Sequence, residues 1–167
     1  MSFYESVVPA YLQMLNSLSA ILDKAEAHCT AKKIDPQVIL GARLYPDMLP
    51  FTRQIQTVAD FAVKGSARLA GAEVPSTPDT ETSFAELKAR LANAIKYVSG
   101  LKPAQFEGAE SRDITFPVGP TNTMTLKGQQ FLSHFSLPNF YFHSAIAHGI
   151  LRHNGVEIGK RDFMGQR

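Results

Sequence analysis

Hydrophobic residues recur every three or four positions along four long stretches of this 167-residue chain. The first stretch covers about residues 3–27, the second begins at Tyr45 and fades by Gly71, and two more cover 83–100 and 127–153. This spacing places the apolar side chains on one face of a helix, where they can be buried against other helices. The pattern therefore predicts four amphipathic helices that pack as a bundle.

The predicted helices are bounded by residues that commonly start a helix. Pro46 and Asp47 suit the first turn of the second helix, because proline's missing N–H costs nothing there and a carboxylate complements the helix dipole. Ser83 followed by Glu86 has the spacing of a capping box, which would start the third helix. Pro9 lies inside the first helix and is expected to bend it or to mark a later start.

Residues 112–126 follow a different period, with apolar side chains at alternate positions around the turn residues Gly119 to Asn122. This alternation predicts a small β-hairpin between the third and fourth helices. The long connectors before the second and third helices permit crossover connections as well as a simple up-and-down order. The tail from Val156 to Arg167 is predicted to be an extended surface segment. The sequence thus predicts an all-α fold over 1–167, a single four-helix-bundle domain with one small hairpin.

Composition narrows the class of protein. Hydrophobic residues make up 44% of the chain and charged residues 19%, which is typical of a globular domain. The net charge of +2 and the scattered Lys and Arg residues argue against a nucleic-acid partner. No stretch approaches about 18 uninterrupted apolar residues, and the N-terminus lacks a signal-peptide pattern, so no membrane partner is expected. The single Cys29 cannot form an internal disulfide, which favours a cytoplasmic location.

Four of the five histidines lie between His134 and His153, which raises the question of a metal site. Two ligands on one helix converge only when they are three or four residues apart. His143, His148 and His153 are five apart, and His134 and His148 are separated by about 21 Å of helix. These histidines therefore form no metal site by themselves. His134, His148 and His153 are predicted to be surface or helix-end residues.

The pair Asn139 and His143 has the required spacing of four. It follows Pro138, which breaks the helix hydrogen-bond ladder and gives ligand groups or water a place to enter. Two roles remain open for His143, a hydrogen-bonded histidine in the core or a groove, and a ligand-facing histidine. The predicted ligand pocket lies between the second and fourth helices. Its lining residues are Asp47, Phe51, Gln54, Asn139 and His143.

Three segments of the chain resemble a known family. They are "LYPDMLPFTRQIQTVADFA", "ARLAGAEVP" and "FYFHSAIAHGILRHNGVEIGKRDFMG". Together they resemble a bacterial domain-of-unknown-function branch of the DinB/YfiT-like four-helix-bundle superfamily. Members of that superfamily typically hold nickel or zinc with one histidine from the second helix and two histidines, four apart, from the fourth. Some are thiol-dependent transferases or hydrolases.

The resemblance transfers to this chain residue by residue. Leu151-Arg152 places His143 at the last histidine of the family pattern. Asn139 then stands where its partner histidine would be, and Asp47 falls near the position of the helix-two histidine. The resemblance implies a divalent metal, nickel or zinc, held by His143, Asp47 and Asn139.

Two functions follow as hypotheses. In the first, the chain is a non-catalytic module with a degenerate metal site that binds a small molecule. The many aromatic residues of the fourth helix further predict a homodimer. In the alternative, it is a divalent-metal-dependent hydrolase or thiol transferase that uses Asp47, Asn139 and His143. No cofactor other than that divalent metal is expected.

Overall fold

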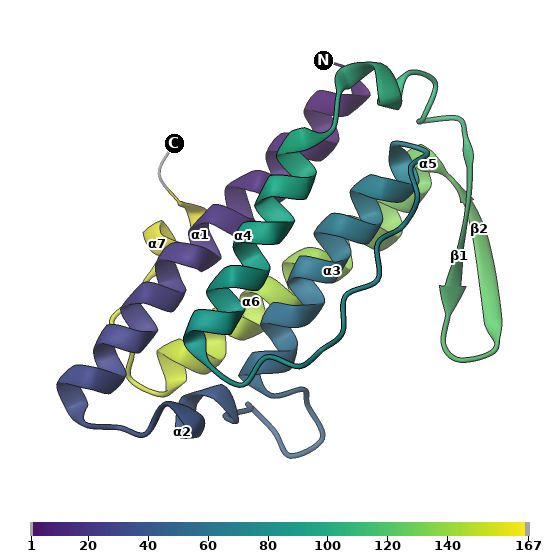
Figure 1. Ribbon diagram of the computed structural model, residues 1–167. Coiled ribbons are helices and arrows are strands. Elements are labelled where there is room, and N and C mark those ends of the chain that lie inside the picture. Colours follow the sequence, from purple (N-terminus) through teal and green to yellow (C-terminus); the bar gives the residue numbers. More distant parts are fainter. Residues whose placement is uncertain (1, 166–167) are drawn as a thin grey trace.

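The computed structural model describes residues 2–165, which are mostly helical with one small antiparallel hairpin (Figure 1). The elements follow in the order α1 (Phe3–Lys32), α2 (Pro36–Leu40), α3 (Phe51–Leu69), α4 (Phe84–Gly100), η1 (Pro103–Phe106), β1 (Asp113–Val118), β2 (Asn122–Lys127), α5 (Gly128–Gln130), η2 (Phe131–Ser136), α6 (Leu137–His153) and α7 (Lys160–Met164).

The long helices pack side by side around one core. Helix α3 packs against both α4 and α6, α1 packs against α4, and the short α7 lies along α1. Figure 1 shows α3 and α4 running in the same direction, so the connection over residues 70–83 has to return along the whole length of α3. This is a crossover, one of the two connections that the sequence allowed.

The buried side chains follow the predicted hydrophobic stripes. On α1, fully buried residues recur from Val7 through Tyr11, Leu15 and Leu18 to Leu22. The helix is continuous through the exposed Pro9. A single lost backbone bond does not break it, because the stripe continues past that position. The capping box of this helix is formed by Ser2 and Glu5.

Two helix boundaries differ from the prediction, and one short helix was not predicted. Helix α3 begins at Phe51 rather than near Tyr45, so Asp47 lies in a turn before the helix and not in its first turn. The connector is held in this path by Arg43, whose guanidinium donates to the carbonyl oxygens of Pro46 and Met48. The connector also contains the unpredicted α2, and α1 extends to Lys32.

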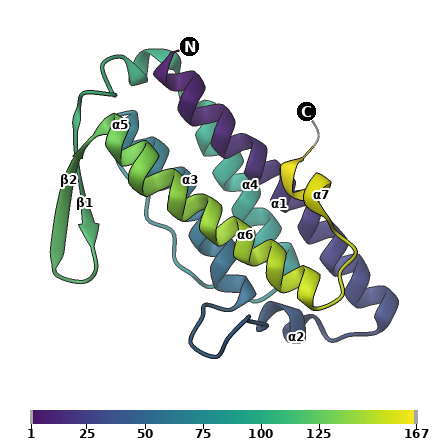
Figure 2. The same ribbon diagram turned by 180° about the vertical axis from the view of Figure 1, so that it is seen from behind.

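Over residues 156–165 the tail is not the extended surface segment that was predicted; residues 166–167 lie outside the described part of the chain. Val156 and Ile158 are buried, and residues after them form α7. Asp162 of α7 pairs with Lys24 of α1 at 2.6 Å, and the side-chain amide of Gln13 donates to the carbonyl of Met164. The tail therefore packs against α1 (Figure 2).

The fourth predicted helix follows a continuous path but changes its winding. Six residues, Phe131–Ser136, form a π-helix just before Pro138, and the N–H of Leu137 donates to the carbonyl of Leu132. Wider turns of this kind occur where the regular ladder is disturbed, often at functional sites. Beside this segment stands the predicted hairpin, whose strand β1 buries Ile114 and Phe116. Within residues 2–165 no helix is both long and apolar enough to span a membrane.

Candidate functional site

Gln54 and His143 are joined by a hydrogen bond between α3 and α6. Gln54 is only 2% exposed, and its side-chain NH₂ donates to the carbonyl of Leu49 at 3.0 Å. Its other end, Oε1, must therefore accept, and it lies 2.7 Å from Nδ1 of His143. The proton of the neutral imidazole is thus on Nδ1, and Nε2 carries the lone pair.

The surroundings of His143 favour its neutral form. Burial lowers the pKa of His143, because a charged imidazolium would lose water without gaining a carboxylate. One face of the ring stacks on Phe61 of α3, with ring centres 6.0 Å apart, and the ring of Phe142 meets it edge-on. His143 is therefore a hydrogen-bonded groove histidine, as one of the two predicted roles requires, with an Nε2 atom that still can accept a proton or bind a ligand.

The other predicted site residues do not gather around this pair in the same way. The side-chain NH₂ of Asn139 donates to the carbonyl of Phe135 at 2.7 Å, at the end of the π-helix. Phe51 is fully buried and packs near Phe84 in the core. Asp47 is exposed in the turn before α3. Of the five residues, the structure directly joins Gln54 and His143.

The donor set fits a tightly bound nickel or zinc ion poorly. Over residues 2–165 there is no group of three or more His, Cys, Asp and Glu side chains arranged to hold a metal. His143 supplies one imidazole nitrogen, whereas Asn139 and Asp47 supply oxygen atoms, which nickel and zinc prefer less.

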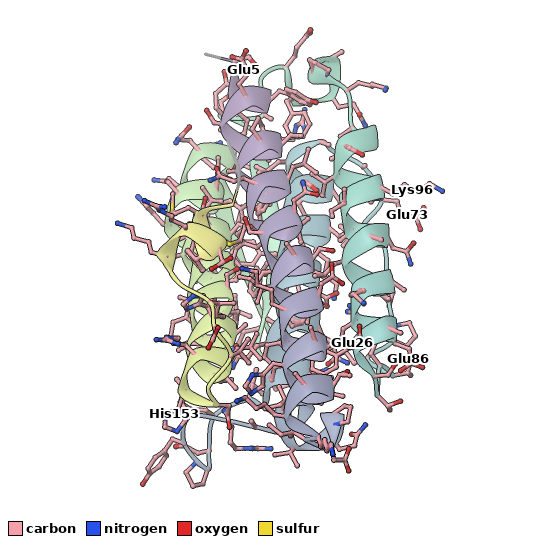
Figure 3. The ribbon with its side chains drawn as sticks, turned by 90° about the vertical axis from the view of Figure 1, so that its left-hand side faces the viewer. Glu5, Glu26, Glu73, Glu86, Lys96 and His153 are labelled. Carbon is pink, nitrogen blue, oxygen red and sulfur yellow. The ribbon has the colours of Figure 1, made fainter. Side chains whose placement is uncertain are left out.

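The remaining histidines of this region lie on the surface or contact the tail. His134 is exposed on η2. Nε2 of His148 lies 3.3 Å from the carbonyl oxygen of Gly159, and its ring meets Phe163 edge-on, so this residue contacts the tail. His153 lies at the end of α6 and is exposed (Figure 3). His134 and His153 lie where the sequence predicted, on the surface and at a helix end, whereas His148 is half-buried against the tail and does not.

A cavity that the sequence did not reveal is lined in part by Phe61. Its volume is about 320 Å³, and α3, the π-helix η2 and strand β1 form its walls. The lining side chains include four aromatic rings and five charged groups. They are Phe61, Phe116, Phe131 and Phe135, and Arg53, Asp60, Lys64, Arg68 and Asp79.

The floor of this cavity is polar, and its hydroxyl groups are hydrogen-bonded to each other. Ser136 of the π-helix and Tyr11 of α1 share a buried hydrogen bond of 2.7 Å beneath Gly65. Burial raises the pKa of Tyr11 despite that hydrogen bond, so the phenol stays protonated. The floor therefore offers no free nucleophile or base.

A sequence signal for this cavity did exist on α3. Arg53, Thr57, Asp60, Lys64 and Arg68 are spaced three or four apart, so they share one helix face. From sequence alone such a face is indistinguishable from a solvated one. Only the aromatic rings that β1 and η2 bring over it turn this face into a cavity wall.

Comparisons with known proteins identify relatives along the whole chain. The model of a family described as a domain of unknown function, DUF1993, matches residues 3–164. A crystal structure of a DinB family member from Shewanella denitrificans is 41% identical, covers 98% of this chain and 92% of its own, and superposes with a TM-score of 0.91. No functionally curated protein matches. The chain therefore belongs to the DUF1993 family and is a DinB-like protein.

Proposed function

We propose that this DinB-like four-helix bundle is a non-catalytic protein that binds a small molecule in the cavity between α3, η2 and β1. The observation that carries the proposal is the cavity itself. At about 320 Å³ it falls within the size range of small-molecule sites, and it combines aromatic walls with a few charged groups. The Gln54–His143 pair adjoins it through Phe61, which lines the cavity and stacks on His143.

The charged groups of the cavity suit binding better than acid–base catalysis. A general base works best when its pKa lies near the working pH. Asp60 is paired with both Lys64 and Arg90. Burial alone would raise the pKa of Asp79, but the hydrogen bond and charge of Arg53, with the charge of Arg90, bring it below its usual value. The Asp79 carboxylate is thus held as an anion, and Asp60 is engaged by two cations.

A fragment panel followed by NMR tests this proposal. Binders should shift amide signals of Thr57, Phe61, Phe116 and Phe135 together. Thr57→Phe places a ring in the cavity and should abolish these shifts.

Thr30→Phe is the matched control, because Thr30 is an exposed helical threonine whose hydroxyl donates to the carbonyl four residues earlier, as that of Thr57 does. It should leave binding unchanged. A panel in which no fragment shifts the cavity signals, or in which Thr57→Phe binds as well as wild type, would overturn the proposal.

A divalent-metal-dependent hydrolase or thiol transferase is the second candidate. It is favoured by the tautomer of His143, because the Gln54 hydrogen bond leaves Nε2 free to coordinate an ion, nickel or zinc. Asp47 and Asn139 would supply the further ligands.

Elemental analysis of the purified protein, with a calorimetric titration of Ni²⁺ and Zn²⁺, tests this candidate. It expects bound metal that is lost in His143→Ala and retained in His153→Ala. Purified protein that contains no metal and binds neither ion in the titration would exclude it.

The proposal extends to assembly and location. We expect a homodimer, because large apolar side chains stay exposed on the connector before α3 and on α6, among them Tyr45 at 66% and Phe142 at 56%. We also expect a cytoplasmic protein, because its one cysteine, Cys29, is free and buried. We expect a bacterial source, because the chain resembles the DinB family member from Shewanella denitrificans.

A further inference from the structure

The cavity between α3, η2 and β1 has an excess of one positive charge on its wall. Three cations, Arg53, Lys64 and Arg68, line it together with two carboxylates, Asp60 and Asp79. Arg53 pairs with Asp79, and Lys64 pairs with Asp60 at 2.6 Å. Both carboxylates also contact Arg90 from α4. Two of the three wall cations are therefore already matched.

Arg68 is the cation without a carboxylate. Among residues 2–165 it forms no ion pair, and its guanidinium donates only a long hydrogen bond of 3.3 Å to the carbonyl of Lys64. Burial lowers the pKa of Arg68, since it removes water from the guanidinium and no anion replaces it. A half-buried guanidinium in this situation gains more from an anionic partner than an exposed one would, because part of its water is already lost.

The rest of the wall selects for a flat apolar group. The rings of Phe116, Phe131 and Phe135 lie 4.4 to 5.8 Å from one another, and Phe61 extends the cluster. The π-helix turns Phe131 and Phe135 toward the same cavity. A cavity of 320 Å³ is about twice the size of one that holds benzene, so one substituted ring fits.

We propose that this cavity binds a small aromatic monocarboxylate, with the carboxylate on Arg68 and the ring against the cluster of Phe61, Phe116 and Phe135. The inference rests on the proposed small-molecule function and adds the chemical class of the ligand. One negative charge balances the wall, whereas a second would face Asp60 and Asp79. A neutral ligand would leave Arg68 without a partner, and a cation would meet a wall that is already positive.

Calorimetry with three isosteric probes tests the inference. Benzoate, benzamide and benzamidine share the ring and differ in charge. Wild-type protein should bind benzoate about tenfold more tightly than benzamide, the difference that one charge-assisted hydrogen-bonded pair supplies, and benzamidine least.

The variants assign this preference to Arg68. Arg68→Met removes the charge and should bind benzoate no better than benzamide, whereas Arg68→Lys should retain part of the preference. Arg152→Met is the matched control, because Arg152 is an exposed arginine on α6, and it should behave as wild type. Circular dichroism confirms that each variant is folded.

The outcomes separate the inference from the function on which it rests. If benzamide binds the cavity as tightly as benzoate, or if Arg68→Met keeps the preference, the ligand class is wrong but the binding function stands. If neither these probes nor any fragment of the panel shifts the cavity signals, both fail.

Discussion

Gly65 controls how closely α3 approaches the π-helix. A Cβ atom at this position would lie 2.5 Å from the hydroxyl oxygen of Ser136 and 2.7 Å from that of Tyr11. These two hydroxyls form the buried hydrogen bond at the floor of the cavity. The absence of a side chain at Gly65 thus allows both the close helix contact and the hydrogen bond beneath it.

Gly65→Ala should therefore destabilise the protein although alanine favours helices. We expect a loss of about 1–3 kcal/mol in the free energy of unfolding, since the added methyl displaces Ser136 or Tyr11 in a packed core. Urea denaturation measures it. Gly100→Ala is the control, because a Cβ atom there would meet nothing within 4 Å, and it should be neutral or slightly stabilising. Equal effects of the two substitutions would contradict the close contact.

His143 should make the protein less stable as the pH falls below neutrality. Its pKa is lowered in the folded state, so between the unfolded value of about 6.5 and that lower value the unfolded chain binds the proton and the folded chain does not. Stability is therefore unaffected well above pH 6.5 and decreases as the pH falls through it.

Unfolding of His143→Asn across pH 8 to 5 measures this effect, because asparagine can still donate to Gln54 but does not titrate. Relative to the variant, wild type should lose stability on acidification. His153→Asn, at the exposed end of α6, is the control and should lose stability on acidification as wild type does. A difference between wild type and His143→Asn that stays constant with pH would contradict the lowered pKa.

At the scale of elements, the crossover over residues 70–83 is held to the bundle by a network around Arg90. The Arg90 side chain of α4 is only 4% exposed and contacts Asp60, Asp79 and Glu81. From α3, Arg53 binds the loop residue Asp79, and Gln56 binds the loop residue Glu81. The connection thus contributes Asp79 to the wall of the cavity between α3, η2 and β1.

Arg90→Met should loosen this connection and reduce stability by about 3 kcal/mol. This is the low end for breaking a buried ion pair, because the carboxylates keep some contact with water. Lys88→Met is the control, since Lys88 forms more exposed ion pairs with Asp23 and Glu26, and it should cost under about 1 kcal/mol. Faster amide exchange over residues 70–83 in Arg90→Met, and not in Lys88→Met, would locate the effect.

The same network predicts sensitivity to acid. Burial alone would raise the pKa of Asp79 and Glu81, but Arg53, Arg90 and Gln56 outweigh it and lower both values. The stability that they contribute is present above their unfolded pKa values, about 3.9 and 4.3, and is lost as the pH falls from these values to the lower folded-state values. Below pH 5 the free energy of unfolding should therefore decrease less with falling pH in Arg90→Met than in wild type.

The elements that the sequence predicted well are those set by local periodicity. The stripe through Tyr11 and Leu18, the start at Ser83 and the alternation around Phe116 each need only neighbouring residues. The start of α3 was misjudged because it depends on Arg43 binding the carbonyls of the connector. Helix α7 was missed because the contacts that fix it join residues 138 and 151 positions apart.

At the scale of the whole molecule, the same distinction explains the candidate site. The spacing of Asn139 and His143 pointed to a site on α6, and the tertiary contact with Gln54 sets the tautomer of His143. The cavity around Arg68 needs three separate elements, so no local pattern identifies it. Phe61 lines this cavity and stacks on His143, so the cavity lies beside the histidine, which is not among its lining residues.

The exposed apolar residues of the connector and α6 lead to the last prediction, a homodimer formed through this face. Cδ1 of Leu44 would lie 3.9 Å from a Cβ atom added at Gly149, so the connector approaches α6 there. Tyr45 and Phe142 are exposed on these two elements. Sedimentation at micromolar concentration should give twice the chain mass for wild type. Tyr45→Glu with Phe142→Glu should give a folded monomer, because both residues are exposed and contribute little to the core. Met124→Glu is the control, because Met124 is an exposed apolar residue on the hairpin, and this variant should remain dimeric. A wild-type monomer would exclude the homodimer, and a dimeric double variant would exclude this face.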